Sequence, residues 1–446
     1  MWKRRSRSRT ALASLLLACG VGTGCASSSQ TKASPVVEQG SRQGADTLAF
    51  TDVNVITLGQ VPVLEHQTVV ITGGRISRLG PRDGTPVPQG ARVIDGAGRY
   101  LMPGMADMHV HLPQEASPAE LERLLELYLV NGVTTVRAMR GGPTQLAVRD
   151  RIRAEGLVAP ELYVGGPPVA EELTPERARA LVEEQQRAGY DFLKPLGGFD
   201  AAAYEALVAR AGELGFPVEG HVPAEVGIDR ALAARQRTIE HVQGYAAAAK
   251  QGPEALEALA RRTREAGICN CPTLDFFAVE YEPDESRLLQ RPGLDHAAAA
   301  DLEAWRKHKR EKAPPADREQ RQQRLQRIVS ALSDAGAPLL VGTDSPGEFR
   351  VPGFSYVEEL QQLVRAGLTP AAVLRAATRT AAECLGTQES AGAVAEGQRA
   401  DLVLLERNPL EDVRHVARPA GVMVRGHWLP REELDRRLAA QSRREP

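Results

Sequence analysis

Between residues 100 and 345, short apolar runs alternate with longer stretches in which apolar residues recur every three or four positions. The first pattern is typical of buried strands, and the second is typical of amphipathic helices. We predict eight strands, at 105–111, 133–139, 161–165, 191–196, 217–222, 237–242, 268–274 and 338–344. The intervening stretches predict helices, among them 118–130, 174–188 and 201–214. This alternation predicts an α/β fold in which a parallel sheet closes into a (β/α)8 TIM barrel.

The two ends of the chain carry a different pattern, of short alternating apolar runs broken by turns. This pattern predicts strands at 50–56, 68–71, 75–80, 397–405 and 421–426. The simplest arrangement joins both ends in one small composite β-sandwich, with the barrel inserted in its middle. The predicted domains are the composite β-sandwich (47–102 and 393–430), the barrel (103–392) and a C-terminal helix or tail (431–446).

Further helices are predicted between the seventh strand and the C-terminal strands. The charged stretch 282–335 is longer than a connection needs, and Pro314-Pro315 breaks it. We expect it to form surface helices near the mouth of the barrel. Two more helices are predicted at 356–366 and 369–385, the second with a Thr-Pro start.

The first 46 residues predict an export signal and a tether. A basic start at 3–9 precedes an apolar run at 11–18, which is too short to span a bilayer and is typical of a secretory signal peptide within 1–25. Residues 26–46 are rich in Ser, Gln, Lys and Gly and predict a flexible tether.

Two cysteines near the end of this signal predict a lipid anchor. The run that ends at Cys19 resembles a bacterial lipobox, and the run that ends at Cys25 is a poorer match that allows a longer apolar segment. We expect acylation at Cys19 or Cys25 and an exported, membrane-anchored lipoprotein in the periplasm or at the cell surface. The alternative is an ordinary cleaved signal.

Composition excludes one class of partner. Of the 446 residues, 42% are hydrophobic and 25% are charged, and the formal net charge is -2. No basic domain stands out, so we expect no nucleic-acid partner. The three remaining cysteines, Cys269, Cys271 and Cys384, have no framework spacing and predict a fold that does not depend on disulfides. Cys269 and Cys271 are expected to be packed thiols, and no pattern indicates an oligomeric state.

Imidazole, amine and carboxylate side chains gather at the ends of the predicted strands. His109 and His111 are two positions apart, so on a strand both rings point to the same side and can meet one metal ion. Equivalent strand-end positions are occupied by Lys194, His221, His241 and Asp344. Barrel enzymes build their active sites from the carboxyl ends of several strands. The set therefore predicts a metal-dependent active site.

Taken singly, each of these residues has a simpler interpretation. A strand-end histidine is commonly a hydrogen-bonded rim residue, Asp344 could cap the next turn, and Lys194 could extend to solvent from an apolar stem. The other histidines lie in charged, polar or turn contexts: His66, His296, His308, His415 and His427. Only the four motif histidines follow apolar strand runs, which favours the joint interpretation.

With these motifs on the page, the chain resembles the amidohydrolase superfamily over about residues 48–430. The motifs that carry the resemblance lie at 103–111, 132–137, 343–345, 366–370 and 397–403. The resemblance implies a metal-bearing (β/α)8 barrel with a composite β-sandwich. Within the superfamily, the pattern is most similar to the imidazolonepropionase and Xaa-Pro dipeptidase-like group.

The same resemblance implies a binuclear centre. His109, His111 and Asp344 would hold a first divalent ion. His221 and His241 would hold a second. Imidazole and carboxylate ligands with open positions favour Zn²⁺, with manganese, iron and cobalt as the other candidates.

Lys194 looks like the lysine that is carboxylated by CO2 in binuclear members and bridges the two ions. A carbamate turns a cationic side chain into a bidentate oxygen ligand, and its charge offsets two close dications. Relatives usually carry an aspartate after the Thr-Thr-Val-Arg run, where this chain has Ala138, and often a histidine after the third strand, where this chain has 165–168, Gly-Gly-Pro-Pro. These differences affect the expected substrate contacts and not the expected metal ligands.

The implied activity is hydrolysis of an amide C–N bond in a dipeptide-like or N-acyl amino acid substrate. Lactone-like and organophosphate esters would also fit one binuclear site. A metal-activated hydroxide would attack the carbonyl, and Asp344 would act as general base and then as general acid toward the leaving nitrogen. The sequence does not name the substrate, because specificity lies in the loops after the strands.

Two other interpretations remain open at this stage. A mononuclear deaminase or cyclic amide hydrolase of the same superfamily is the first, although deaminases often have a glutamate where this chain has Ala224, with Glu225 one position further. The second is a non-catalytic surface lipoprotein, although such proteins normally lose their metal ligands. Turnover of any amide substrate would separate these alternatives.

Overall fold

The structure is a computed structural model that describes residues 47–441. The predicted signal peptide, the tether, Cys19 and Cys25 lie outside the described residues. The strands are β1 (Thr47–Ile56), β2 (Val63–Thr72), β3 (Arg75–Pro81), β4 (Arg92–Asp95), β5 (Tyr100–Pro103), β6 (Met105–Val110), β7 (Val133–Ala138), β8 (Glu161–Val164), β9 (Glu219–Gly220), β10 (Thr238–Glu240), β11 (Cys269–Cys271), β12 (Leu402–Leu405), β13 (Gly421–Val424) and β14 (His427–Pro430).

Helices fill most of the connections. They are α1 (Pro118–Val130), α2 (Pro143–Glu155), α3 (Pro175–Arg187), α4 (Ala201–Glu213), α5 (Ile228–Ala233), α6 (Ala246–Gln251), α7 (Pro253–Ala266), α8 (Leu274–Tyr281), α9 (Glu285–Leu288), α10 (Ala299–Glu311), α11 (Arg318–Asp334), α12 (Phe354–Arg365), α13 (Pro370–Ala376), α14 (Arg379–Leu385) and α15 (Arg431–Gln441). Short 3₁₀ helices are η2 (Arg82–Gly84), η3 (Leu294–His296) and η4 (Val413–Val416).

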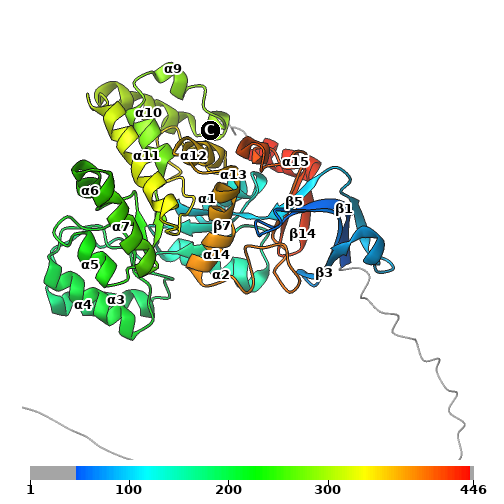
Figure 1. The fold of residues 1–446 in the computed structure, drawn as a ribbon, viewed down its shortest axis with the longest axis horizontal. Coiled ribbons are helices and arrows are strands. Elements are labelled where there is room, and N and C mark those ends of the chain that lie inside the picture. The colour runs from blue at the N-terminus through cyan, green and yellow to red at the C-terminus, as the bar shows by residue number, and fades with distance from the viewer. Residues whose placement is uncertain (1–46, 442–446) are drawn as a thin grey trace, which may run out of the picture. The chain divides into compact units, whose positions relative to one another are not determined.

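One mixed sheet combines strands from both ends of the described chain. Its order is β14-β13-β12-β5-β1-β2-β3, and β4 pairs with β1. The junction is the antiparallel pair of β12 with β5, in which Leu404 lies opposite Leu101. In Figure 1 the blue strand β1 and the red strand β14 lie in this same region. The assignment of these strands to a separate β-sandwich domain stays a prediction.

The remaining strands are parallel and form a curled sheet. They make two three-stranded groups, β6-β7-β8 and β11-β10-β9. The segment around residue 193 has parallel bridges both to Gly165 after β8 and to Val218 before β9. The segment 339–345 does the same between Asn270 of β11 and Val110 of β6. Parallel pairing therefore continues from each group to the other, as βα units require.

Two of the predicted strands, 191–196 and 338–344, are not regular strands. Each is an extended segment held by isolated bridges and by single hydrogen bonds, such as that from Leu193 N to the Pro217 carbonyl at 2.9 Å. Pro195 and Pro338 have no backbone N–H, so each segment lacks a donor that a regular ladder would use. The parallel direction of both segments was predicted correctly, but the prediction that they form regular strands was wrong.

Several helix ends agree with the predictions and have a visible cause. α1 begins after Ser117, whose side chain accepts the N–H of Glu120 at 3.2 Å. α3 begins after Thr174, as its Thr-Pro sequence predicted. The predicted helix 369–385 is instead two helices, α13 and α14. The carbonyl of Ala377 accepts a hydrogen bond from the N–H of Ala106 in β6, which takes it out of the helical ladder.

The apolar stretch that begins at Tyr100 splits into β5 and β6 at Gly104. A Cβ atom at Gly104 would lie 2.1 Å from Thr134 Oγ1, so no larger residue fits between the two sheets. β5 belongs to the mixed sheet, and β6 begins the parallel sheet and ends next to His111. Gly104 alone connects β5 to β6, so it fixes the position of β6, and of the histidine pair at its end, relative to the mixed sheet.

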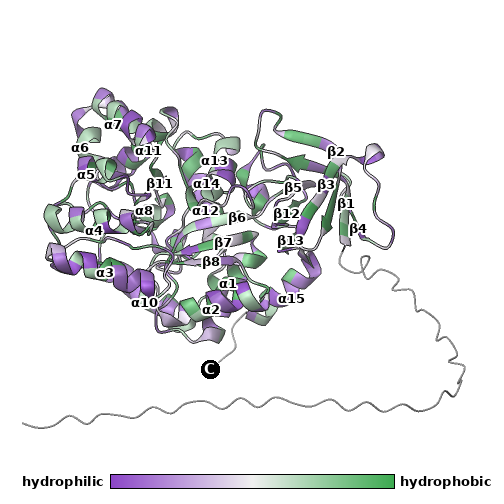
Figure 2. Ribbon diagram, turned by 90° about the horizontal axis from the view of Figure 1, so that it is seen from below, coloured by the Kyte–Doolittle hydropathy of each residue, from purple (hydrophilic) through white to green (hydrophobic). Residues whose placement is uncertain are grey.

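Charged helices cover the outside of the parallel strands. Residues 282–335 form α9, η3, α10 and α11, with a break that contains Pro314-Pro315, as predicted. Figure 2 shows that α3 and α10 are largely hydrophilic. Within residues 47–441, no helix is long and apolar enough to cross a membrane.

A disulfide joins Cys269 in β11 to Cys384 in α14, across 115 residues of sequence. The prediction of packed thiols is therefore wrong for Cys269, and it holds for Cys271, which is a buried free thiol. The spacing of the cysteines along the chain gave no signal for this bond, because Cys269 and Cys384 meet only when α14 packs against β11. Ala106, Met108 and Leu340 surround this contact.

Candidate metal centre

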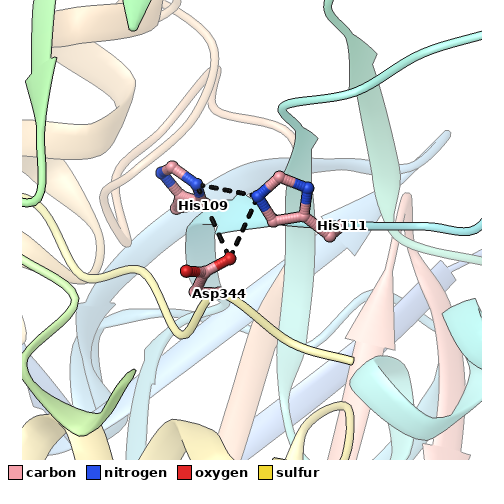
Figure 3. A group of neighbouring side chains, drawn as sticks. All are labelled: His109, His111 and Asp344. Atoms are coloured by element: carbon pink, nitrogen blue, oxygen red, sulfur yellow. Dashed lines mark hydrogen bonds and ion pairs between the residues drawn. The ribbon is translucent and has the colours of Figure 1, made fainter. Parts of the chain in front are cut away.

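Three side-chain atoms converge where β6 ends: Nε2 of His109, Nε2 of His111 and Oδ1 of Asp344. Nε2 of His111 lies 3.2 Å from Nε2 of His109 and 3.0 Å from Asp344 Oδ1. Nε2 of His109 lies 3.8 Å from the same oxygen. Figure 3 shows both imidazole rings and the carboxylate directed at one point. The predicted pairing of the two histidines on one side of the strand is present.

Glu240 fixes the orientation of the first imidazole. Its Oε2 atom lies 2.6 Å from Nδ1 of His109, and both side chains are completely buried. A carboxylate at this distance accepts the proton of Nδ1, which leaves the Nε2 lone pair directed toward His111 and Asp344. Carboxylate–imidazole pairs of this kind orient metal-binding histidines.

Glu240 is held in turn by Arg137 at the centre of the parallel sheet. Arg137 is completely buried and donates from NH2 to Glu240 Oε1 at 2.9 Å and from NH1 to Glu219 Oε2 at 2.5 Å. Thr238 Oγ1 also donates to Glu240. Burial acts to raise the pKa of Glu240, but Arg137 and His109 hold it well below its ordinary value. Glu240 is therefore an ionised acceptor for His109.

Asp107 positions the third converging side chain. It lies two residues before His109, is buried, and accepts hydrogen bonds from the Thr343 N–H at 3.0 Å and from Thr343 Oγ1 at 2.7 Å. Asp344 follows with φ of +58°, a left-handed conformation that is uncommon for aspartate. Such strained positions are retained where surrounding contacts hold them, and they cluster at functional sites.

A cavity of about 340 Å³ adjoins these atoms and contains the other predicted residues. His111 and Asp344 line it together with Lys194, His221 and His241. The ring centroid of His241 lies 4.6 Å from that of His109 and 5.0 Å from that of His221. Nδ1 of His241 is 2.7 Å from Thr273 Oγ1. The structure therefore brings all six predicted site residues together.

Burial shifts the pKa values of this group strongly. It lowers the pKa of His109 to about 4 and those of His221 and His241 to about 3, so these imidazoles are neutral near pH 7. Burial also lowers the pKa of Lys194 to about 8. It opposes ionisation of Asp344, but the hydrogen bond from His111 and the nearby histidines hold that pKa well below its ordinary value.

The donor set fits divalent metal ions. Two imidazole nitrogens and one carboxylate oxygen from His109, His111 and Asp344 meet at one point, which is a donor set that a divalent cation binds. Nε2 of His221 is buried and has no hydrogen-bond partner among the described residues. A buried imidazole nitrogen without a partner is unfavourable unless a ligand binds it.

A second group of ligand-type atoms, from His109, Glu240 and Cys271, does not fit an ion. Glu240 is already occupied by Arg137 and by His109 Nδ1. Burial raises the pKa of the Cys271 thiol well above its ordinary value, so the metal-binding thiolate does not form. Cys271 is a packed thiol, as predicted.

Arg137, Glu219 and Glu240 were not predicted as parts of the site. A signal was present, because each is a charged residue within a predicted strand, and such residues need partners when they are buried. Strand alternation alone places Glu240 and His241 on opposite faces. The left-handed φ of His241, +58°, interrupts the alternation, so both side chains lie next to His109.

Comparison with known families gives one match that covers most of the described chain. The profile of the amidohydrolase family matches residues 100–429. Imidazolonepropionase of Rhizorhabdus wittichii is 27% identical over 404 residues, which cover 82% of this chain and 92% of that protein. The 5-methylthioadenosine/S-adenosylhomocysteine deaminase of Symbiobacterium thermophilum is 49% identical over 53 residues, which span only 12% of that protein.

Solved structures agree with the family match. A putative prolidase from Bifidobacterium longum has a TM-score of 0.69 and 25% identity, over 89% of this chain and 98% of that one. Bottromycin amidohydrolase has a TM-score of 0.70 and 29% identity, over 91% of this chain and 95% of that one.

Proposed function

Since the chain belongs to the amidohydrolase family, we propose that it hydrolyses an amide C–N bond at two divalent metal ions. His109, His111 and Asp344 would hold one ion, and His221 and His241 the other. The observation that carries this proposal is the convergence of His109 Nε2, His111 Nε2 and Asp344 Oδ1 beside a cavity large enough for a small substrate. Nε2 of His221 is buried and has no hydrogen-bond partner within residues 47–441, which supports a second ligand position.

The ligand set favours zinc, and the ions would lower the pKa of water and polarise the scissile carbonyl. Asp344 supplies the proton transfers. Its carboxylate is ionised and lies at the cavity wall, so it accepts the proton of the attacking water and delivers it to the leaving nitrogen. An amide nitrogen is a poor leaving group until it is protonated, which makes this delivery necessary.

Lys194 is the proposed bridge between the ions, as a carbamate formed with CO2. Its side chain is 1% exposed and lines the cavity with His221 and His241. The lowered pKa of Lys194, about 8, leaves a fraction of neutral amine near pH 7. The neutral amine would attack CO2 and release one proton, which leaves an anionic carbamate with two oxygen atoms that can act as ligands.

The substrate that we propose is a dipeptide-like or N-acyl amino acid. A prolidase-like structural neighbour and the imidazolonepropionase relative both have names that imply C–N hydrolysis. A mononuclear deaminase is less well supported, because Glu225 lines a different cavity with Glu172 and Asp200. Glu225, the residue nearest to a deaminase glutamate in sequence, is therefore absent from the lining of the cavity that contains His111 and Asp344.

We further propose a complete (β/α)8 barrel with a composite β-sandwich, exported as a lipoprotein through Cys19 or Cys25. The parallel bridges at both ends of the curled sheet support barrel closure. The Cys269–Cys384 disulfide supports an oxidising compartment, because such bonds are rare in the cytosol of most organisms. The full chain should incorporate labelled palmitate, and one of the two substitutions, Cys19→Ala or Cys25→Ala, should abolish this incorporation.

Metal content tests the proposed function most directly. The described residues 47–441 belong to one compact unit, so protein that lacks residues 1–46 is expressed with bicarbonate and analysed for metals. We expect about two zinc-like ions per chain and a loss of metal in Lys194→Ala. Lys309→Ala is the matched control, because burial also lowers the pKa of Lys309, which lies at another cavity.

The outcomes separate the alternatives. About one ion that is unaffected by Lys194→Ala would favour mononuclear chemistry, and absence of metal would exclude the proposed mechanism. With two ions bound, a library of dipeptides and N-acyl amino acids is screened for turnover. Failure to hydrolyse any amide would favour a non-catalytic surface protein.

A further inference from the structure

We propose that Arg140 binds a free carboxylate of the substrate, and that Phe276 and Phe277 contact an apolar side chain of the same molecule. The substrate class would then be N-acyl or N-aminoacyl derivatives of apolar amino acids with an unblocked α-carboxylate. This inference rests on the proposed amide hydrolysis and narrows its substrate.

Arg140 lies in the loop after β7, on the wall of the cavity that also contains Lys194 and Asp344. The backbone of this loop is fixed. Gln114 Nε2 donates to the Gly141 carbonyl at 2.8 Å. A Cβ atom at Gly141 would lie 2.0 Å from the Gly165 carbonyl oxygen, so the two loops are in close contact. The guanidinium therefore extends from a rigid base.

No carboxylate in residues 47–441 forms an ion pair with Arg140, whereas most other buried or cavity-lining arginines, such as Arg137, have such partners. Asp344 is the sole acidic side chain among the described residues that line this cavity, and it belongs to the ligand group. Arg140 is the basic side chain of this lining that the proposed metal centre does not use. A guanidinium matches a substrate carboxylate with two parallel hydrogen bonds.

Another part of the wall is apolar. Phe276 and Phe277 from α8 line the cavity with their ring centroids 5.0 Å apart. The Arg350 guanidinium lies 4.9 Å from the Phe276 ring centroid and supports it from outside the cavity lining. Leu196 and Pro168 complete the apolar surface.

Hydrogen bonds to Glu359 hold the first turn of α8 in place. The carboxyl oxygens of Glu359 accept the backbone N–H groups of Leu274 at 3.0 Å and of Asp275 at 2.6 Å, in the first turn of the helix. The two aromatic rings are thus presented on a fixed element. A cavity with a cation in one loop and two aromatic rings on a nearby helix fits an amino acid with an apolar side chain and a free carboxylate.

The experiment compares substrates that differ only in this charge. Metal-loaded protein is given N-acetyl-L-phenylalanine or N-acetyl-L-phenylalaninamide, and acetate release is measured. We expect Arg140→Met to lower kcat/KM for the acid by about 100-fold, mainly through KM, as loss of a charged pair would. The amide should change less than about twofold, and Arg140→Lys should fall between because lysine lacks the planar fork.

Two further variants control the interpretation. Arg261→Met removes an exposed arginine from α7, outside the cavity lining, and should change neither substrate. Phe277→Ala should reduce kcat/KM for N-acetyl-L-phenylalanine by about tenfold and for N-acetylglycine much less, since glycine has no side chain to contact the ring.

Equal losses on acid and amide in Arg140→Met, or no loss on the acid, would overturn the assignment. Faster hydrolysis of neutral amides than of acids by the unaltered protein would overturn it too, while leaving the proposed function intact. If no amide is hydrolysed, the proposed function fails, and calorimetry still tests Arg140. In that case L-phenylalanine should bind at least tenfold more weakly to Arg140→Met, with L-phenylalaninamide unaffected, and equal binding would refute the assignment.

Discussion

Oε2 of Glu240 lies 2.6 Å from Nδ1 of His109, and neither side chain is accessible to solvent. The contact joins residues 131 positions apart and directs the other imidazole nitrogen at the converging ligands. The geometry of the candidate metal centre thus depends on a carboxylate that is not itself one of the proposed ligands.

Replacement of this carboxylate should weaken metal binding. We expect Glu240→Gln to lower metal affinity by about 10- to 100-fold, because His109 loses its charged acceptor. Competition with a chelator measures the change. Glu219→Gln is the matched control, since Glu219 also pairs with Arg137 but does not contact His109. Equal metal affinities in the two variants would show that metal binding depends on the ion pairs of Arg137 and not on the orientation of the His109 imidazole.

Asp344 is expected to affect rate more than substrate binding. Asp344→Asn keeps a ligand oxygen but cannot carry the proton from water to nitrogen. We expect kcat to fall by roughly 10²- to 10⁴-fold with little change in KM. Metal content is measured on the same samples, so that a loss of ions is distinguished from a loss of proton transfer. Near-normal kcat with full metal content would exclude the proposed role.

The disulfide should stabilise the protein under oxidising conditions. We expect Cys384→Ser to lower the free energy of unfolding by about 2–5 kcal/mol, because the bond closes a long loop in the unfolded chain. Denaturant unfolding with and without dithiothreitol measures this. Reductant should destabilise the unaltered protein and leave Cys384→Ser unchanged. Cys271→Ala retains the disulfide, so it should keep the full sensitivity to reductant.

Glu359 should make stability fall as pH rises. Burial, together with the nearby Asp275 carboxylate, raises the pKa of Glu359 well above its ordinary value of 4.5, although two backbone N–H groups oppose this. The folded state therefore retains a proton that the unfolded state releases above about pH 4.5. Stability should decline above that pH, by at most about 1.4 kcal/mol per pH unit for one proton.

Glu359→Gln removes the ionisation and should flatten this decline. Unfolding free energies are measured by urea titration from pH 5 to pH 8. Glu358→Gln, one residue away and partly exposed, is the control and should leave the slope unchanged. An unaltered slope in Glu359→Gln would mean that Glu359 is ionised in the folded protein.

Local sequence accounted for much of the fold. The limits of α1 and α3 followed from Ser117 and Thr174, whose side chains cap helices at their own positions. The histidine pair followed from the two-residue period of a strand. Both are relations between near neighbours, so the pattern along the chain contains them.

Prediction was less accurate where distant segments act on each other. The predicted helix 369–385 is interrupted because the Ala377 carbonyl is hydrogen-bonded to Ala106. The predicted strand at 338–344 is irregular, and its last residue adopts a left-handed conformation beside the ligand group. Neither effect has a signal within the segment that it changes.

By itself, the sequence determined which residue types stand at the ends of apolar runs and so which side chains could bind metal: His109, His111, Lys194, His221, His241 and Asp344. Only the tertiary structure decided that Glu240 orients His109, that Cys269 meets Cys384 and that Arg140 lines the cavity with no ion pair in residues 47–441. The physical reason is that periodicity and capping act over a few residues. Buried charge pairs, disulfides and cavity walls are instead made between segments that only the packing of the parallel strands and their helices brings together.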